Sequence, residues 1–200
     1  VFRELRERGL HGVSYVVSDD HKGLTKAIAR QFQGAIWQRC QVHFIRNMRA
    51  MVAKKDRGRI TASLKEITGA ESLDSARKRL NEAVDVWTAT HPKVAEHLDM
   101  FGEEMLAVYA LPETHRKRMR TTNMLERFNE EIKRRTRVVR LFPNEQACIR
   151  LVSALAMEEN ENWMERKYLN MEAEQNLQSL TGGIHLMSRS LPITEALLSQ

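Results

Sequence analysis

The chain lacks the features that mark exported or membrane proteins. It has only two cysteines in 200 residues, Cys40 and Cys148. Two cysteines are too few for disulfides to stabilise a chain of this size, so we expect its stability to come from a hydrophobic core and its compartment to be reducing. The longest apolar run, residues 105–111, is far shorter than the roughly 20 residues that a membrane span requires. No basic stretch followed by an apolar stretch opens the chain. We therefore expect a globular, cytoplasmic protein without a membrane partner.

The formal charge of +6 is concentrated in one segment. Residues 114–140 contain ten Lys or Arg and three Glu, a net charge of +7, so the rest of the chain is close to neutral. A basic block of this kind is typical of proteins that meet a phosphate-rich partner, because each contact releases condensed counterions. A solvated helix face can show the same pattern.

Strand and helix signals alternate at the start of the chain. Residues 13–18 are rich in β-branched and aromatic side chains, which predicts a buried strand. It ends at Asp19 and Asp20, and apolar residues at helical spacing follow it. A second short strand is predicted at 35–39 and a helix at 42–52. These segments predict an α/β unit.

From residue 54 onward the pattern becomes helical. The stretch 54–112 shows no strand signal and predicts an all-helical insertion of about four short helices. Segments 1–53 and 113–170 would then form the core, and 171–200 a tail without a strong period. The predicted fold class is α/β and predominantly helical.

Asp19 and Asp20 stand where a buried strand ends and a helix begins. Ligands usually bind at this edge of an α/β sheet, and a carboxylate held there is well placed to ligate a divalent metal. Asp is also a preferred helix N-cap, so a purely structural role stays open at this point.

Glu126 lies inside the basic segment. Asn123 and Glu126 have the spacing of a capping box, in which Asn123 caps a helix and Glu126 reaches back to its backbone. On that helix Leu125, Phe128 and Ile132 predict an apolar face, with Glu126 on the opposite side. A carboxylate on a basic surface is also explained by a metal ion between it and a phosphate.

Cys40 and His43 have the spacing of half a zinc site. No second Cys or His pair lies at a suitable distance, so structural zinc is not expected. We predict instead a buried Cys40 and a hydrogen-bonding His43 on the turn between the second strand and its helix, near Asp19.

Three blocks of sequence occur in order, separated by the helical stretch. They are residues 18–24 (Ser-Asp-Asp-His-Lys-Gly-Leu), 37–47 (Trp-Gln-Arg-Cys-Gln-Val-His-Phe-Ile-Arg-Asn) and 121–137, which begins Thr-Thr-Asn-Met-Leu-Glu-Arg-Phe-Asn-Glu. Together they resemble the bacterial insertion-sequence transposases related to the plant Mutator element. The resemblance covers about residues 1–170.

The resemblance implies a partial ribonuclease-H-like domain, interrupted by the all-helical insertion, in which two aspartates and a glutamate hold two Mg²⁺ ions. On this match Asp19 is the second aspartate and Glu126 the glutamate, both catalytic and metal-binding. Asp19 is preferred to Asp20 on the Ser-Asp-x-His pattern. Three further residues would support the active site: Cys40, His43 and Asn123.

The implied function is cleavage and transfer of DNA strands at transposon ends by two-metal phosphoryl transfer. The partners would be double-stranded DNA and further copies of the chain in a synaptic complex, at the nucleoid. We expect the Asp19 and Glu126 carboxylates to lie within about 8 Å of each other, so that a cation can bridge them. The side chains implied to hold the DNA backbone are Arg127, Lys133, Arg134, Arg135 and Arg137.

The first aspartate of the family is missing from this match, because no Asp precedes Asp19. We therefore expect a carboxy-terminal piece of a transposase that is inactive as it stands. Two alternatives remain. One is a non-enzymatic helical DNA-binding protein, in which Asp19 and Glu126 are only caps. The other is a different ribonuclease-H-like nuclease, in which the helical stretch 54–111 would be integral to the core.

Overall fold

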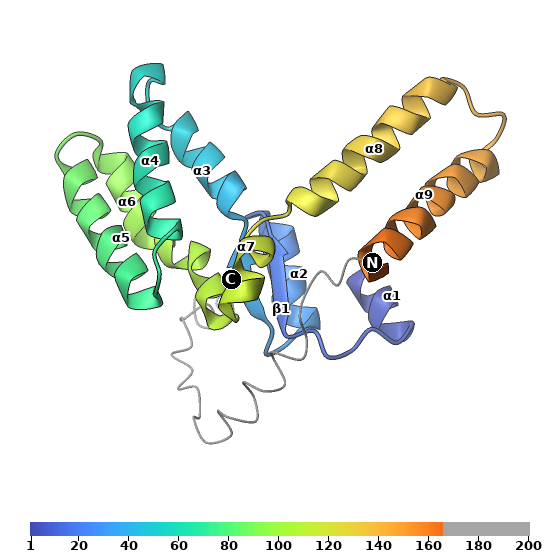
Figure 1. The fold of residues 1–200 in the computed structure, drawn as a ribbon, viewed down its shortest axis with the longest axis horizontal. Coiled ribbons are helices and arrows are strands. Elements are labelled where there is room, and N and C mark those ends of the chain that lie inside the picture. Colours follow the sequence, from blue (N-terminus) through green and yellow to red (C-terminus); the bar gives the residue numbers. More distant parts are fainter. Residues whose placement is uncertain (166–200) are drawn as a thin grey trace. The chain divides into compact units, whose positions relative to one another are not determined.

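The computed structural model describes residues 1–165, so the predicted tail 171–200 lies outside the described residues (Figure 1). The elements confirm a predominantly helical α/β chain. In order they are α1 (Phe2–Glu7), β1 (Tyr15–Ser18), α2 (Lys22–Gln31), β2 (Ile36–Arg39), α3 (Gln41–Ala50), η1 (Lys54–Asp56), α4 (Arg57–Thr68), α5 (Leu73–Thr88), α6 (Pro92–Phe101), η2 (Gly102–Met105), η3 (Ala107–Ala110), α7 (Glu113–Met119), α8 (Asn123–Val139) and α9 (Glu145–Glu165), where η marks a 3₁₀ turn.

The two strands form a parallel pair connected through α2. Tyr15 lies opposite Ile36 and Ser18 opposite Arg39. The backbone N–H of Cys40 donates to the carbonyl of Ser18 at 2.7 Å, which extends the ladder past the strand ends. Because parallel strands end at the same edge of a sheet, the residues after Ser18 and after Arg39 emerge side by side. Both strands begin slightly later than predicted.

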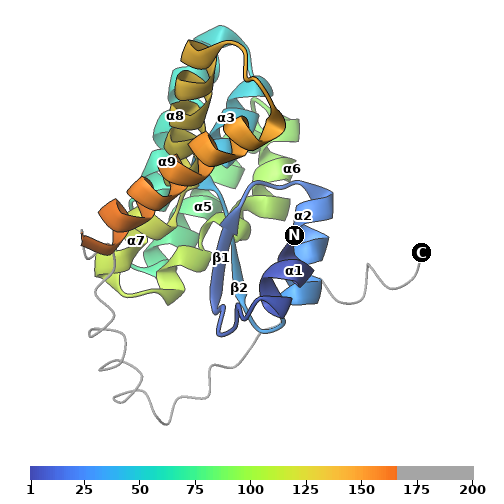
Figure 2. The same cartoon turned by 90° about the vertical axis from the view of Figure 1, so that its right-hand side faces the viewer.

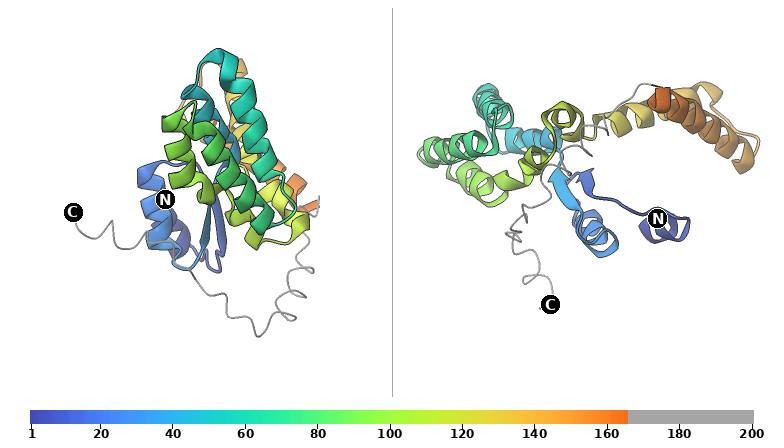
Figure 3. Two further views of the ribbon diagram at one scale, coloured as in Figure 1. Left: turned by 90° about the vertical axis from the view of Figure 1, so that its left-hand side faces the viewer. Right: turned by 60° about the horizontal axis from the view of Figure 1, so that its bottom comes forward.

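The hydrophobic core lies among α3, α4, α5 and α6, which gather on one side of the strand pair, with α1 and α2 on the other (Figure 3). Phe44 and Met48 of α3 are fully buried against residues such as Leu64 and Leu98. Burial of each such side chain contributes about 1.5–3 kcal/mol to folding. The helical stretch therefore shares its core with α3.

The stretch 54–112 contains three α-helices and three 3₁₀ turns, which corrects the predicted four short helices. Its most apolar run, 105–111, folds as tight turns that pack on β2 instead of forming a helix. Buried amides hold these turns. Gln38 Nε2 and Gln41 Nε2 both donate to the carbonyl of Met105 at 2.9 Å, and Gln38 Oε1 accepts from the N–H of Val108 at 2.6 Å.

Helices α8 and α9 run side by side as a hairpin (Figures 1 and 2). Phe128 and Trp163 pack edge to face with ring centroids 6.5 Å apart, and Leu155 of α9 is buried. Met124 also lines the groove between the two helices, but Leu125 is 54% exposed. The predicted apolar face was therefore wrong at Leu125, because that residue lies about 100° around the helix from Met124.

No helix within residues 1–165 combines the length and the apolar character that crossing a bilayer requires.

Candidate active site and nucleic-acid interface

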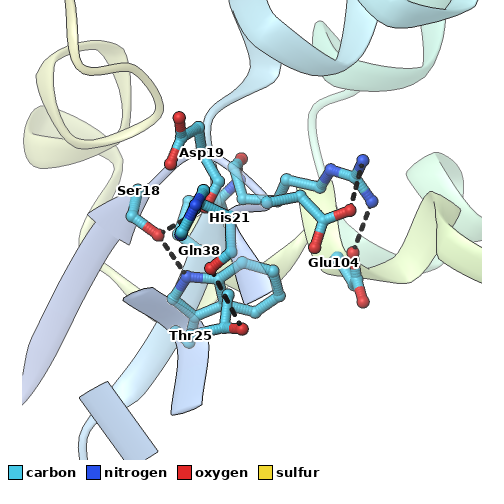
Figure 4. A network of polar contacts seen from close by, with 9 residues as sticks. Ser18, Asp19, His21, Thr25, Gln38 and Glu104 are labelled. Atoms are coloured by element: carbon cyan, nitrogen blue, oxygen red, sulfur yellow. Dashed lines mark hydrogen bonds and ion pairs between the residues drawn. The ribbon is translucent and has the colours of Figure 1, made fainter. Parts of the chain in front are cut away.

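The turn after β1 is held by a buried serine (Figure 4). Ser18 Oγ accepts a hydrogen bond from Trp37 Nε1 at 2.9 Å and donates to the carbonyl of Asp19 at 2.7 Å. Ser18 is 5% exposed, so these bonds form in a largely dry environment, where they are stronger than in water. The backbone of Asp19 is therefore fixed by both strands.

Asp20 takes part in an ion-pair network around a buried arginine. Its carboxylate lies 2.9 Å from Arg39 Nη2, and Arg39 Nη1 lies 2.9 Å from Glu104 of η2. The Arg39 side chain is 2% exposed and its guanidinium sits over the rings of Phe44 and Phe101. Burial raises the pKa of Glu104, although Arg39 opposes this rise. Asp20 thus ties the turn after β1 to the helical stretch.

Asp19 has a different environment. No hydrogen bond or ion pair reaches its carboxylate from the described residues, and Figure 4 shows this group turned away from Glu104. The N-cap of α2 is His21, and no side chain caps that helix. The interpretation of Asp19 or Asp20 as a cap was therefore wrong, since α2 begins one residue later than a cap at Asp20 would require. Asp19 is available to an external ligand.

Glu126 is held at the start of α8. The N-cap is Thr122, so the capping box on Asn123 was wrong: the helix begins one residue earlier, at Asn123 itself. The hydroxyl of Thr122 donates to Glu126 Oε1 at 3.1 Å, and His43 Nε2 lies 3.6 Å from the same oxygen. In the described part of the chain, no hydrogen bond occupies Oε2 of Glu126.

Cys40 joins these elements. Its thiol sulfur is fully buried and lies 3.4 Å from both the backbone N and the Oγ1 of Thr122. Its own N–H bonds to Ser18, as described above. The neighbouring N–H of Gln41 donates to the carbonyl of Arg120 at 3.0 Å, which fixes the connection between α7 and α8 against α3. The prediction of a buried Cys40 on a strand-to-helix turn is confirmed. The prediction for His43 was wrong, because His43 lies within α3 and its Nδ1 is buried without a hydrogen-bond partner among the described residues.

The structure thus brings together the end of β1, the start of α3 and the start of α8. These elements carry Asp19, His43 and Glu126. Asn123 does not contact Glu126 through its side chain and instead lines a separate basic groove. Sequence reasoning did not single out Thr122 as a contact of Glu126, although its place four residues before Glu126 was visible.

Carboxylates are the ligands that Mg²⁺ prefers, so Asp19 and Glu126 suit a divalent cation chemically. No group of three or more His, Cys, Asp or Glu side chains in residues 1–165 is arranged to hold a metal ion. Within these residues Asp19, after β1, and Glu126, in α8, are therefore separate candidate ligands.

The basic side chains of α8 divide into two sets. Lys133 and Arg137 follow Glu126 by 7 and 11 residues, which places them on the same face of the helix. Both are exposed and form no ion pair within the residues described. Arg134 and Arg135 instead pair with Glu131, at 2.7 and 2.8 Å.

Glu131 changes the charge that the second set presents. Hydrogen bonds from Arg134 and Arg135 lower the pKa of Glu131 to about 2, so its carboxylate is ionised at neutral pH. Arg135 also lines the groove between α8 and α9. The fifth predicted cation, Arg127, lines the same basic groove as Asn123.

The sequence model of the family described as "Transposase, Mutator family" matches residues 1–166 of this chain. The transposase for insertion sequence element ISRM5 of Rhizobium meliloti is 44% identical over 169 residues, 84% of this chain and 42% of the relative. That for IS406 of Burkholderia multivorans is 42% identical over 83% of this chain and 43% of the relative. That for IS256 in transposon Tn4001 of Staphylococcus aureus is 35% identical over 86% and 45%.

The chain therefore spans less than half the length of these relatives. The family match runs from the first residue to the end of α9 and includes Asp19, Cys40 and Glu126. The chain belongs to the Mutator family of transposases.

Proposed function

We propose that residues 1–165 form part of the ribonuclease-H-like catalytic centre of a transposase, which cuts and joins DNA strands at transposon ends. One observation supports this most directly. Hydrogen bonds lead from Ser18, at the end of β1, through Cys40 to Thr122 and Glu126. Asp19 and Glu126 come from distant parts of the sequence. The buried Cys40 connects the end of β1, which precedes Asp19, to the start of α8, which carries Glu126.

Asp19 and Glu126 would hold Mg²⁺. In two-metal enzymes such ions activate the attacking oxygen and stabilise the leaving oxygen. The contribution of this chain is to position the ligands. The Thr122 hydroxyl donates to one oxygen of Glu126, close to His43, which restricts the rotation of the carboxylate and leaves the other oxygen for a cation. Asp19 keeps its charge available because Asp20 supplies the partner of Arg39.

Lys133 and Arg137 would hold the DNA. They lie on the Glu126 face of α8, about 10 and 16 Å along the helix axis from it at a rise of roughly 1.5 Å per residue. Contacts from these side chains to phosphates would position the backbone without reading its sequence. A duplex lying along α8 would then present a phosphate near Glu126.

The isolated chain should bind a cation weakly and should not cleave DNA, because it supplies two of the three carboxylates of the triad. The intact enzyme would hold two ions. Because transposition joins two ends, we expect several copies of the enzyme to assemble on DNA.

Paramagnetic broadening by Mn²⁺ tests the shared cation site. In the ¹⁵N-labelled 200-residue chain, we expect Mn²⁺ to broaden amides after β1 and at the start of α8 together. Asp19→Asn should reduce the broadening at both segments, and Glu126→Gln should do the same, because each removes one ligand of a shared ion. Asp20→Asn is the matched control, since it makes the same change one residue away and should preserve the effect.

Independent broadening of the two segments, or its loss only in Asp20→Asn, would contradict the proposal. Asp19 and Glu126 would then be unrelated surface acids, and a non-enzymatic DNA-binding protein would be the better description of this chain.

A further inference from the structure

A groove of about 770 Å³ lies between α3, the end of α4, α7 and the start of α8. Lys and Arg side chains from three helices and from the connection before α8 line this groove. No Asp or Glu is among the described residues that line it. The basic residues are Lys65, Lys117, Arg118, Arg120 and Arg127. The whole chain carries 32 basic and 26 acidic residues, so a groove with five of one sign and none of the other is a marked local imbalance.

Three of these five cations have no partner of opposite charge among the described residues. Lys65, Lys117 and Arg127 are exposed and form no ion pair within residues 1–165. Like charges gathered in one concave surface repel each other and focus a positive potential into the solvent there. An anionic partner with several charges in a row would relieve this repulsion.

The remaining lining suits a nucleic-acid strand. Val42, Ile45 and Met124 contribute apolar surface, and the side-chain amide of Asn123 can donate hydrogen bonds. Sugars present apolar surface and phosphates accept hydrogen bonds, so both parts of a DNA backbone find complementary groups.

The groove adjoins the proposed catalytic centre. Thr121, Asn123 and Arg127 line it, while Thr122 and Glu126 lie between them in the sequence. Consecutive residues of an α-helix point about 100° apart, so α8 directs Glu126 toward His43 and Arg127 toward the groove. The groove and the Lys133 face are therefore two distinct surfaces that meet near Glu126.

We propose that this groove binds the sugar–phosphate backbone of duplex DNA on the side of Glu126 away from Lys133 and Arg137. The helical stretch would then contact DNA directly, through Lys65 of α4. This inference rests on the proposed function, because it places the groove beside a catalytic Glu126. It adds a second DNA surface formed by α4, α7 and the start of α8.

Fluorescence anisotropy with a short random-sequence duplex tests the groove. The double variant Lys65→Gln/Lys117→Gln removes two phosphate contacts. The log–log slope of affinity against salt should therefore become shallower by about 1.8, at roughly 0.9 per contact. The matched control Lys26→Gln/Lys93→Gln makes the same charge change at exposed lysines of α2 and α6 outside the groove, and should leave most of the slope intact.

Equal slopes in the two double variants would overturn the groove proposal. Circular dichroism should confirm that both variants fold, since all four lysines are exposed. The Mn²⁺ experiment separates this inference from the proposed function. If the groove is wrong, Lys65→Gln/Lys117→Gln binds DNA as the control does while Asp19 and Glu126 still share Mn²⁺. If the catalytic proposal is wrong, the Mn²⁺ effect is absent whatever the groove variant does.

Discussion

Replacement of Arg39 by Met should strongly destabilise the fold. The side chain is 2% exposed and pairs with Asp20 and Glu104, both at 2.9 Å. Removal of one partner from a buried ion pair costs about 3–5 kcal/mol, because the other charge is left buried and unpaired. Asp20 and Glu104 are 42% and 23% exposed, so water screens part of this penalty. We therefore expect a loss near the lower limit, about 3 kcal/mol.

Met is chosen because it keeps apolar contact with the rings on which the guanidinium rests. Urea unfolding followed by far-ultraviolet circular dichroism measures the free energy of unfolding, with an unchanged m-value as the check on two-state behaviour. Glu104→Gln should cost about 1 kcal/mol, because an amide oxygen still accepts from Arg39. Asp20→Asn should cost less than about 1 kcal/mol, because that carboxylate is nearly half exposed.

The triple variant Arg39→Met/Asp20→Asn/Glu104→Gln refines the test. It should recover about 1–2 kcal/mol relative to Arg39→Met alone, since no buried carboxylate remains unpaired. A loss below about 1 kcal/mol in Arg39→Met, or no recovery in the triple variant, would refute the interpretation of this network as a buried ion-pair link.

Three further outcomes are expected. The Glu131 carboxyl should titrate near pH 2 in carbon-detected NMR. Its pKa is lower in the folded than in the unfolded chain, so its contribution to the free energy of unfolding should be complete above pH 4.5 and should be lost as the pH falls from 4.5 through 2. Glu131→Gln should tighten binding to random-sequence DNA and steepen its salt dependence, because it releases Arg134 and Arg135. Gly102→Ala should cost about 1–3 kcal/mol in urea unfolding, since an added Cβ would lie 2.5 Å from Leu80 Cδ1 in the core.

Each of these has a contrary result. Glu130→Gln changes the net charge as Glu131→Gln does but has no ion pair in the residues described, so an equal effect on the salt slope would show that net charge alone acts. Titration of Glu131 near 4.5 would show that the arginine contacts do not persist in solution. An unchanged unfolding midpoint in Gly102→Ala would show that Leu80 moves aside at little cost.

Local pattern was sufficient for the elements that frame the site. β-Branched and aromatic residues around Val16 indicated the first strand, and apolar spacing indicated the helices that follow. The run Trp37 to His43 was singled out as one motif, and the structure explains its members separately. Gln38 holds η2 and η3, Arg39 anchors Asp20, and Cys40 bridges to Thr122.

The charge of α8 was only partly readable from the sequence. Five basic residues were assigned to DNA, and all five are exposed. Helical spacing places Lys133 and Arg137 on the Glu126 face. Spacing also permits the pairs that Glu131 forms with Arg134 and Arg135, but the choice between pairing and a free cation depends on side-chain rotamers.

The sequence by itself determined the family, the strand–helix–strand–helix order of its first 50 residues and the two acids worth considering, because these depend on residue type and short-range spacing. It could not tell Asp19 from Asp20 on physical grounds, since adjacent aspartates are chemically identical until one meets a buried Arg39. Only the tertiary structure decided that, just as it placed Lys65 and Arg127 along one groove. Contacts between residues far apart in the chain arise when α3, α4 and α7 pack, and no local period encodes that packing.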